Sequence, residues 1–358
     1  MKNFQEPCKD LFLSLVAIDS PAGHEKIVSD FIAAKLKKLG IKTENDSYGN
    51  LIAKVPGQGA PLMLCAHMDT VEPGRGIKAV VKGDRITSVG DNILGADDKG
   101  GITEILVAVE HLVRNKVAHR PLEIVFTREE EIGSHGAKNL DYKRLRAKEG
   151  LVLDRSGGAA IIVVAAPFIT DITIDIQGKA AHAGHPEKGI DAIKVAARAI
   201  SLARLGRIDE ETTANVGIIR GGEIRNGVPE RVSIRAEVRS HVKAKMTKEV
   251  AAIKSVFENE AKRVQAKIKI KTTLECDGYK YSANDPLVKR LGQLWRELGS
   301  EPLFEKVGGV SDANEFVKKG IKAVTIGYGG LDPHTSKESI RVSDMAKITG
   351  FLVRFLSE

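Results

Sequence analysis

The 358-residue sequence predicts a three-layer α/β sheet domain into which a smaller module is inserted. Three observations support this fold class. Short apolar runs alternate with helical segments near both ends of the chain, as expected of a sheet covered by helices on both faces. The central stretch has the order strand, helix, strand, strand, helix, strand, which is the βαββαβ order of a ferredoxin-like module. The length also exceeds the ~100–200 residues of one typical domain.

Apolar periodicity locates the elements of the first part. Residues 25–39 carry apolar side chains at helical spacing, and Gly40 follows as a C-cap signal. A helix is also expected at 102–112, opening after Gly100 and Gly101. Short buried strands are expected at 51–55, 62–66, 122–126, 151–153 and 161–164, with a hairpin at 80–82 and 85–88.

The pattern changes after Pro167. Ile172, Ile174 and Ile176 alternate with polar residues, which indicates a sheet with one solvent-exposed face. We expect a sheet domain of residues 1–167 and 276–358 and an inserted domain of residues 168–275. The inserted domain would hold strands at 172–176, 213–220, 231–239 and 266–274 and helices at 190–205 and 246–260. The α/β pattern then returns with helices at 287–298, 312–318 and 343–356 and a strand at 323–326.

Charge does not indicate a nucleic-acid partner. Lys and Arg total 55 against 47 Asp and Glu, a net charge of +8. The basic residues are scattered in pairs such as Lys37-Lys38, which is typical of a solvated surface, and aromatic residues are only 4%. We therefore expect no nucleic acid among the partners.

Composition also bears on the compartment. No apolar run approaches the ~20 residues that a membrane span needs, and residues 1–10 lack a secretory apolar region. Cys8, Cys65 and Cys276 form neither a metal-ligand spacing nor a disulfide framework. A protein without membrane contact in the reducing cytoplasm is expected.

His67 directly follows the strand expected at 62–66, and ligands of α/β sheets bind where strands end. Asp69 lies two residues on and faces the same way if the segment is extended. We expect its carboxylate to accept a hydrogen bond from the second ring nitrogen of His67, as carboxylates do beside metal-bound histidines. The spacing alone fits a structural hydrogen bond equally well.

Asp97 and Asp98 precede Gly100 and Gly101. Two adjacent carboxylates there can form simply a turn and a helix N-cap. They cannot share one face, however, so one side chain can point into a site while the other points to the helix start.

Further acidic residues and a histidine follow other strands. Glu129–Glu131 follow the strand at 122–126, Asp154 ends the strand at 151–153, and His334 follows the strand at 323–326. Carboxylates crowded at the end of a buried strand repel one another unless a cation compensates them. Mixed imidazole and carboxylate ligands suit zinc, with manganese or cobalt as substitutes. The carboxylates exceed the needs of one ion, so two ions ~3.5–4 Å apart fit better.

Five segments in order resemble a known family. His67-Met68-Asp69-Thr70-Val71, the 95–101 segment Gly-Ala-Asp-Asp-Lys-Gly-Gly, the 130–133 segment Glu-Glu-Ile-Gly, Asp154 and His334 are similar to the motifs of zinc aminopeptidases and aminoacylases. That family includes glutamate carboxypeptidase and peptidase T. The tripeptide aminopeptidase branch, peptidase T, is most similar, on its Gly-Ala-Asp-Asp-Lys block and the aspartate at 154.

The resemblance implies a role for each site residue. His67 would bind one zinc ion and His334 the other, Asp97 would bridge them, and Glu131 and Asp154 would complete the ligands. A cis peptide is implied from Asp97 to Asp98. Asp69 would orient His67. Glu130 would be the general base for a hydroxide held between the two metal ions, although Glu129 leaves the register of the glutamates open by one position.

The resemblance also implies substrate contacts and a dimer. His182 would reach the carbonyl oxygen of the substrate, in the same chain or from a partner subunit, with His185 as a competitor for this role. Arg239 would bind a substrate carboxylate, and Asn226 would also contact the substrate. The inserted domain would serve as lid and dimerisation domain, so a homodimer is expected. Gly308–Asp312 could present main-chain donors to substrate, or could be simply a helix-capping loop.

These residues predict a cytoplasmic, metal-dependent exopeptidase that hydrolyses short peptides. Two alternatives use the same chemistry: an amidohydrolase that deacylates N-acyl amino acids, and a carboxypeptidase. A third is a peptide-binding protein that keeps the fold, which the complete set of metal-binding and base residues disfavours.

Overall fold

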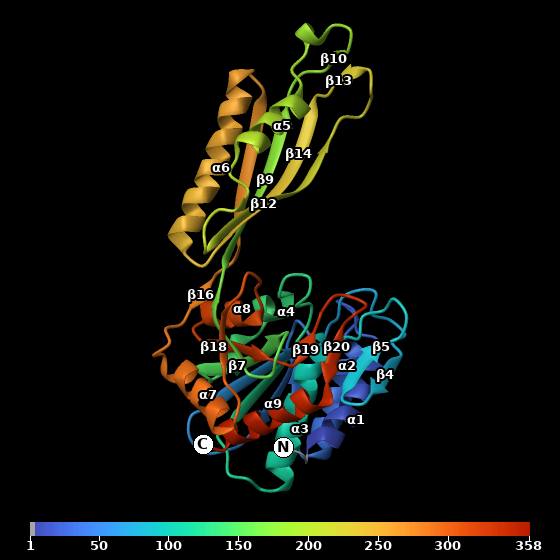
Figure 1. The fold of residues 1–358 in the computed structure, drawn as a ribbon, viewed down its shortest axis with the longest axis vertical. Coiled ribbons are helices and arrows are strands. Elements are labelled where there is room, and N and C mark those ends of the chain that lie inside the picture. The colour runs from blue at the N-terminus through green and yellow to red at the C-terminus, as the bar shows by residue number, and fades with distance from the viewer. Residues whose placement is uncertain (1–3) are drawn as a thin grey trace. The chain divides into compact units, whose positions relative to one another are not determined.

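The computed structural model describes residues 4–358; of the polar N-terminal stretch, residues 1–3 lie outside the described part. The chain divides into two compact units (Figure 1). The first contains the chain up to Val164 together with Tyr281–Lys306 and Ser311–Glu358. The second contains Ala165–Lys280 and Val307–Val310. In residues 4–358, no helix is both long enough and apolar enough to cross a membrane.

The first unit is built on a mixed sheet. Its strands follow the order β1-β2-β6-β3-β7-β18-β8, and β17 also pairs with β8. β3 runs parallel to β6 and β7, and β18 runs parallel to β7. The bounds are β1 Thr43–Asn45, β2 Leu51–Val55, β3 Leu62–His67, β6 Leu122–Thr127, β7 Glu149–Arg155, β8 Ile161–Ala166, β17 Leu303–Lys306 and β18 Lys322–Gly327.

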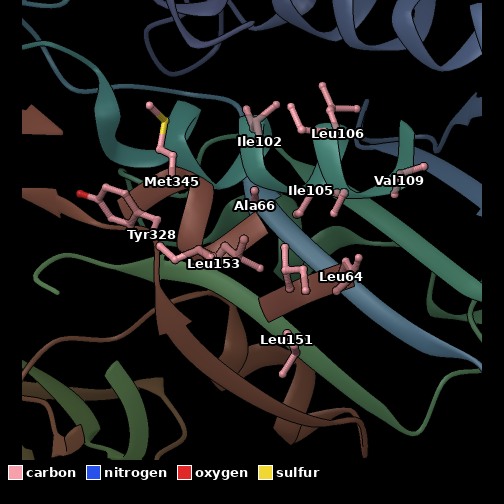
Figure 2. Close-up of a cluster of buried hydrophobic side chains, with 14 of the residues drawn as sticks. Leu64, Ala66, Ile102, Ile105, Leu106, Val109, Leu151, Leu153, Tyr328 and Met345 are labelled. Carbon is pink, nitrogen blue, oxygen red and sulfur yellow. The ribbon is translucent and has the colours of Figure 1, made fainter. Parts of the chain in front are cut away.

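The central strands are apolar because both of their faces are covered. Every residue of β3 and of β6 is buried. Leu64 and Ala66 point from β3 toward Ile102 and Ile105 of the neighbouring helix α3 (Figure 2). Cys65 points to the opposite face, where its sulfur lies 4.0 Å from Asp312. This alternation leaves only the strand ends for polar side chains.

Helices form the two outer layers. One core cluster joins the sheet to α1 Gln5–Val16, α2 Lys26–Lys38, α3 Ala96–Arg114, α7 Pro286–Glu297 and α9 Val342–Leu356. On the face to which Cys65 points lie α4 His135–Asn139 and α8 Asp312–Lys318, which contact each other. The predicted three-layer α/β domain is confirmed.

Helix α3 spans Ala96–Arg114 and so begins before the predicted start at 102, with a kink at Asp97 and Asp98, whose φ and ψ are non-helical. Gly100 and Gly101 lie inside its regular part. A Cβ atom added at Gly101 would lie 2.6 Å from the main-chain oxygen of Leu153. The two glycines therefore do not break the helix, and Gly101 lets it approach strand β7 closely. This contact places the start of α3 beside the carboxyl ends of the central strands.

The predicted hairpin is part of a small separate sheet. Strands β4 Ala79–Lys82 and β5 Arg85–Ser88 form it, and β20 Ser339–Arg341 and β19 Gly330–Leu331 extend it in the order β19-β20-β5-β4. β19 and β20 flank the segment that carries His334, so this small sheet holds both ends of that segment.

The second unit has the predicted βαββαβ order. Its antiparallel sheet runs β11-β12-β14-β9-β15, and α5 Ala192–Leu202 and α6 Lys243–Arg263 pack on one face. The core uses the inward isoleucines of β9, and the fold class of an inserted ferredoxin-like module is confirmed. The remaining bounds are β9 Phe168–Gln177, β10 Ala181–His182, β11 Gly206–Arg207, β12 Thr212–Gly221, β13 Gly227–Val228, β14 Arg231–Ser240, β15 Lys267–Cys276 and β16 Tyr279–Lys280.

Candidate metal centre

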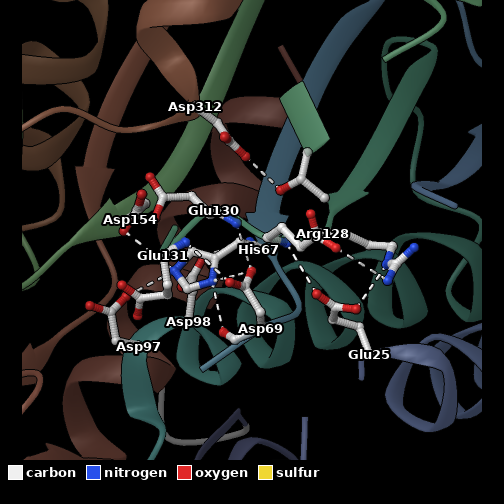
Figure 3. Close-up of polar contacts among 12 residues, drawn as sticks. Glu25, His67, Asp69, Asp97, Asp98, Arg128, Glu130, Glu131, Asp154 and Asp312 are labelled. Carbon is white, nitrogen blue, oxygen red and sulfur yellow. Dashed lines mark hydrogen bonds and ion pairs between the residues drawn. The ribbon is translucent and has the colours of Figure 1, made fainter. Parts of the chain in front are cut away.

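His67 ends strand β3 and is 2% exposed (Figure 3). Its Nδ1 lies 2.9 Å from the main-chain oxygen of Asp69. Because a carbonyl oxygen only accepts hydrogen bonds, this contact places the ring hydrogen on Nδ1. Nε2, the remaining ring nitrogen, then faces the Asp97 carboxylate at 3.3 Å with its lone pair available to a metal ion.

Asp97 and Asp98 point in different directions, as their adjacency predicted, and the peptide bond between them is cis. The Asp98 carboxylate accepts from the main-chain nitrogens of His67, at 3.2 Å, and Gly101, at 3.1 Å. It thereby joins the start of α3 to the end of β3 and leaves Asp97 to face the site.

The two oxygens of Asp97 face two different histidines. Oδ1 lies 3.3 Å from Nε2 of His67, and Oδ2 lies 3.5 Å from Nε2 of His334. Glu131 lies 3.0 Å from His334, and Asp154 lies 3.8 Å from His67. The five side chains thus form two neighbouring groups with the Asp97 carboxylate common to both.

Glu130 lies in the same cluster. Donor atoms of His67, Glu130 and Asp154 lie within 4.8 Å of one another, as do those of His67, Asp97 and Glu131. Glu130 is therefore placed both to ligate a cation and to exchange a proton. Burial raises its pKa well above the usual value, and repulsion from Asp312 and Glu131 raises it further.

The electrostatics of the cluster fit cations. Burial raises the pKa of Asp154 well above its usual value, and the neighbouring Glu130 and Asp97 add to this rise. Hydrogen bonds that His334 donates to Asp97 and Glu131 raise its pKa to about 10. A field that favours a proton on His334 also favours a metal ion, and nitrogen–oxygen donor sets of this kind suit zinc, manganese or cobalt.

Glu129 lies outside the cluster. Its φ is +53°, and its carboxylate accepts a hydrogen bond from the Tyr48 hydroxyl at 2.5 Å. Arg128 lies 3.6 Å from the same carboxylate and donates to buried Glu25 at 2.8 Å. Of the three consecutive glutamates, the structure thus brings only the second and third to His67 and His334, whereas Glu129 lies 3.5 Å from His135.

Asp69 contacts His67 differently from the prediction. The hydrogen bond of the imidazole goes to the main-chain oxygen of Asp69, and the nearest carboxylate oxygen is 3.5 Å from Nδ1. The carboxylate instead accepts from the main-chain nitrogens of Glu130, at 2.9 Å, and Glu131, at 3.1 Å. The turn after β6 presents these two N–H groups, so Asp69 anchors the glutamate pair as well as the histidine.

Two buried carboxylates beside the cluster were not predicted as site residues. Glu338 accepts hydrogen bonds from the main chain just before Asp97. Asp312 accepts from the Thr127 hydroxyl at 2.5 Å, and burial raises its pKa to about 6. Ser311 caps helix α8, which matches the capping interpretation of that loop. No short-range sequence signal marks Glu338, because its partners lie more than 240 residues away along the chain.

The predicted substrate-binding residues all belong to the second unit. His182 is exposed and pairs with Gly227 across β10 and β13, while Asn226 accepts a main-chain hydrogen bond from Ala183 at 2.9 Å. Arg239 lies near the end of β14, where its guanidinium donates to both oxygens of Glu237, at 2.8 and 3.0 Å. His182 and Asn226 are thus neighbours, and Arg239 is not.

Comparisons with known proteins agree with the site. The model for peptidase family M20/M25/M40 matches residues 63–358. The uncharacterized protein YqjE of Bacillus subtilis (strain 168) is 37% identical and aligns over 97% of this chain and 96% of its own length.

Two solved structures are similar over nearly the whole chain. One is the aminopeptidase PepT from Bacillus cereus ATCC 10987, with a TM-score of 0.94, 37% identity and coverage of 99% of this chain and 98% of that one. The other is a tripeptidase from Staphylococcus aureus subsp. aureus Mu50, with a TM-score of 0.96, 32% identity and the same coverage. The resemblance of the motifs is confirmed, and this chain belongs to peptidase family M20/M25/M40.

Proposed function

We propose that this chain is a metal-dependent aminopeptidase that hydrolyses short peptides, with tripeptides as its substrate class. One observation carries the proposal: the Asp97 carboxylate faces His67 with one oxygen and His334 with the other, at 3.3 and 3.5 Å. A carboxylate so placed suits two adjacent metal ions. The names of the similar structures, an aminopeptidase PepT and a tripeptidase, support the choice of substrate.

Two zinc ions would occupy the cluster, with cobalt or manganese as substitutes. His67, Asp97 and Asp154 would hold one ion, and Asp97, Glu131 and His334 the other. When bound, the pair would supply a water of lowered pKa between them and positive charge for the developing oxyanion. The chain's own part is to hold these donors in place, which Asp69 and Asp98 do through main-chain hydrogen bonds.

Glu130 would act as the general base. Its carboxylate would take the proton of the attacking water and return it to the leaving amine. The Ser134 hydroxyl lies 3.3 Å from one Glu130 oxygen, and Asp69 holds its main-chain nitrogen. A carboxyl whose pKa is raised by burial is suited to this exchange near neutral pH.

The predicted inserted domain, residues 168–275, makes up most of the second unit and would serve as lid and dimerisation domain, with residues 1–167 and 276–358 as the catalytic domain. His182 would stabilise the substrate carbonyl oxygen, Asn226 would contact the same end of the substrate, and Arg239 would bind its carboxylate. Arg239 lies eight positions along β14 from the first residue of the strand, Arg231, a distance of ~26 Å.

A tripeptide extends only ~10 Å. Strand β10, which carries His182, pairs with β13 just before the start of β14, whereas Arg239 lies near the end of β14 (Figure 1). One short substrate therefore cannot contact both residues of the same chain. We infer that in a homodimer His182 reaches the substrate bound to the partner subunit, while Arg239 acts within its own chain.

The edge strand β12 is the surface that we propose for this dimer. Its neighbour β11 covers only Thr213 and Ala214, so the rest of its outer edge lacks a partner strand in the described chain. Ile218 and Ile219 on this strand are 46% and 49% exposed. The opposite edge strand, β15, carries alternating lysines, which discourage strand pairing.

We also propose that the protein works in the cytoplasm. Its cysteines at positions 8, 65 and 276 are all free, and buried thiols of this kind persist in a reducing compartment.

The function is tested with a peptide panel. The zinc-loaded protein is assayed on a tripeptide, the same tripeptide with an acetylated N-terminus, a dipeptide and an N-acetyl amino acid. We expect release of the first residue of the free tripeptide, loss of activity after chelation, and recovery with zinc, cobalt or manganese. Preferential cleavage of the N-acetyl amino acid would refute the aminopeptidase in favour of a deacylase, and release of the last residue in favour of a carboxypeptidase.

A further inference from the structure

We propose that Glu338 is a positioning residue that holds the Asp97 and His334 segments together and so sets the affinity of the centre for metal. The inference rests on the proposed dinuclear site. Glu338 itself is 1% exposed and belongs to the first unit, as do Asp97 and His334.

Three hydrogen bonds connect Glu338 to the main chain around Asp97. Oε2 accepts from the nitrogen of Leu94 at 2.7 Å and from that of Gly95 at 2.8 Å. Oε1 accepts from the nitrogen of Asp97 itself at 3.0 Å. Both oxygens are thus committed to main-chain donors, which makes Glu338 a support for the Asp97 segment rather than a metal ligand.

The chain that leads into α3 depends on this acceptor. Asp97 and Asp98 have non-helical φ and ψ, and the Asp98 carboxylate itself accepts from Gly101 at the first regular turn of the helix. The N–H groups of Leu94, Gly95 and Asp97 come before that turn, so no bond within the helix can satisfy them. Glu338 supplies the acceptor for all three.

Glu338 also fixes the segment that carries His334. It lies four residues after His334, and its own main-chain nitrogen donates to Thr335 at 3.1 Å. The Thr335 hydroxyl donates to the main-chain oxygen of Asp332 at 2.8 Å, which closes a compact turn around His334. Strand β20 begins at the next residue and pairs with β5. The buried Glu338 side chain therefore joins the Asp97 segment to the turn that carries His334, to which the Glu338 main chain belongs.

The test compares two isosteric variants. Glu338→Gln removes the charge and one acceptor. The matched control is Glu123→Gln: Glu123 is 3% exposed and accepts from the main-chain nitrogens of Arg146, at 2.8 Å, and Ala147, at 2.9 Å. Glu123 lies at the other end of β6 from the metal centre. Zinc affinity is measured by competition with a chelator, and stability by denaturation of the metal-free proteins.

We expect Glu338→Gln to weaken binding of at least one zinc ion 10–100-fold, the typical effect of removing a residue that orients metal ligands. Excess zinc should restore both the stoichiometry and most of the peptidase activity. Glu123→Gln should lower stability but bind zinc as the wild type does. If Glu338→Gln does not fold, Glu338→Asp is measured instead, since it keeps the charge but is too short to reach all three donors.

Wild-type zinc affinity in Glu338→Gln, with stability lowered as in the control, would show that Glu338 simply stabilises the fold of this segment and would overturn the inference. Failure of the proposed function is distinguishable, because a protein that binds two zinc ions but cleaves no peptide leaves the affinity comparison intact. A wild-type protein that binds no zinc would refute the metal centre and this inference together.

Discussion

Replacing Asp69 by asparagine tests whether its carboxylate sets the position of the glutamate pair. The two carboxylate oxygens accept from the main-chain nitrogens of Glu130 and Glu131 at 2.9 and 3.1 Å, and Asp69 is fully buried. Asparagine keeps one acceptor but turns an NH₂ group toward the other N–H. The hydrogen bond from His67 to the main-chain oxygen of residue 69 is unaffected.

One buried N–H left without a partner costs about 1–3 kcal/mol. We therefore expect Asp69→Asn to lower the free energy of unfolding of the metal-free protein by that amount. Loosening the turn that carries the base and one ligand should also lower kcat 10–100-fold, the range seen for residues that orient metal ligands. The measurements are urea denaturation of the metal-free protein and steady-state kinetics on a tripeptide at saturating zinc.

Asp46→Asn is the matched control. Asp46 is 6% exposed, and one of its oxygens accepts from the main-chain nitrogens of Tyr48, Gly49 and Asn50 at 2.9–3.0 Å. It should lose comparable stability and keep its kcat at saturating zinc. If both variants lose stability but Asp69→Asn keeps wild-type kcat, the carboxylate does not position the catalytic glutamate, and our reasoning fails.

Four further predictions follow from the same structure. Glu130→Gln should bind both metal ions yet lose kcat ~10²–10⁴-fold, as expected for a general base. If Glu130→Gln instead loses metal, while Glu131→Gln binds both ions but is inactive, then Glu131 is the base and Glu130 the metal ligand. Ile218→Lys should shift the dimer toward monomer in sedimentation, and unchanged association would exclude β12 as the interface. Glu104 is buried, neither of its oxygens has a hydrogen-bond partner in residues 4–358, and burial raises its pKa. The folded state therefore keeps a proton that the unfolded state loses, so stability should fall as pH rises above about 4.5. Glu104→Gln should remove this fall, which thermal melts at pH 5 and 8 would show. Asp285→Ala, which removes the N-cap of α7, should cost about 0.5–2 kcal/mol of stability at pH 7. Burial opposes the charge of Asp285, but Lys322 and the main-chain nitrogens of the helix hold its pKa below the usual value. The cost should therefore shrink below about pH 4, as the Asp285 carboxylate becomes protonated, and a loss independent of pH would contradict this.

The sequence predicts the elements that carry the site because buried strands and amphipathic helices leave strong periodic signals. β3, β6 and β7 are short apolar runs, and the polar residue that ends each one lies at the same edge of the sheet. His67 and Asp154 could therefore be placed in one cluster from their positions after strands alone. The assignment of roles within the cluster needed the family resemblance.

Other features leave no signal at short range. Glu338 is a charged residue in a loop and looks solvent-exposed in the sequence, and only the folded chain shows three main-chain donors converging on it. The departure of Glu129 from the cluster depends on a single positive φ angle. In the sequence, Gly100 and Gly101 look like a break before the helix. Their place inside α3 is not visible there, because Gly101 packs against Leu153 of β7, some fifty residues further along the chain.

The antiparallel pairing of β8 with β16 makes the second unit exchangeable. Lys280 pairs with Ala165 and Tyr279 with Ala166, so the points where the chain leaves for the insertion and returns from it are direct neighbours across one ladder. Cα atoms in such pairs lie ~4.5–5.5 Å apart, a gap that a two-residue hairpin can close. A single insertion or excision at this ladder could add, remove or replace about a hundred residues without breaking the parallel strands that carry His67 and Asp154. The inserted module can therefore diverge in sequence and size while the cluster at the ends of those strands is preserved.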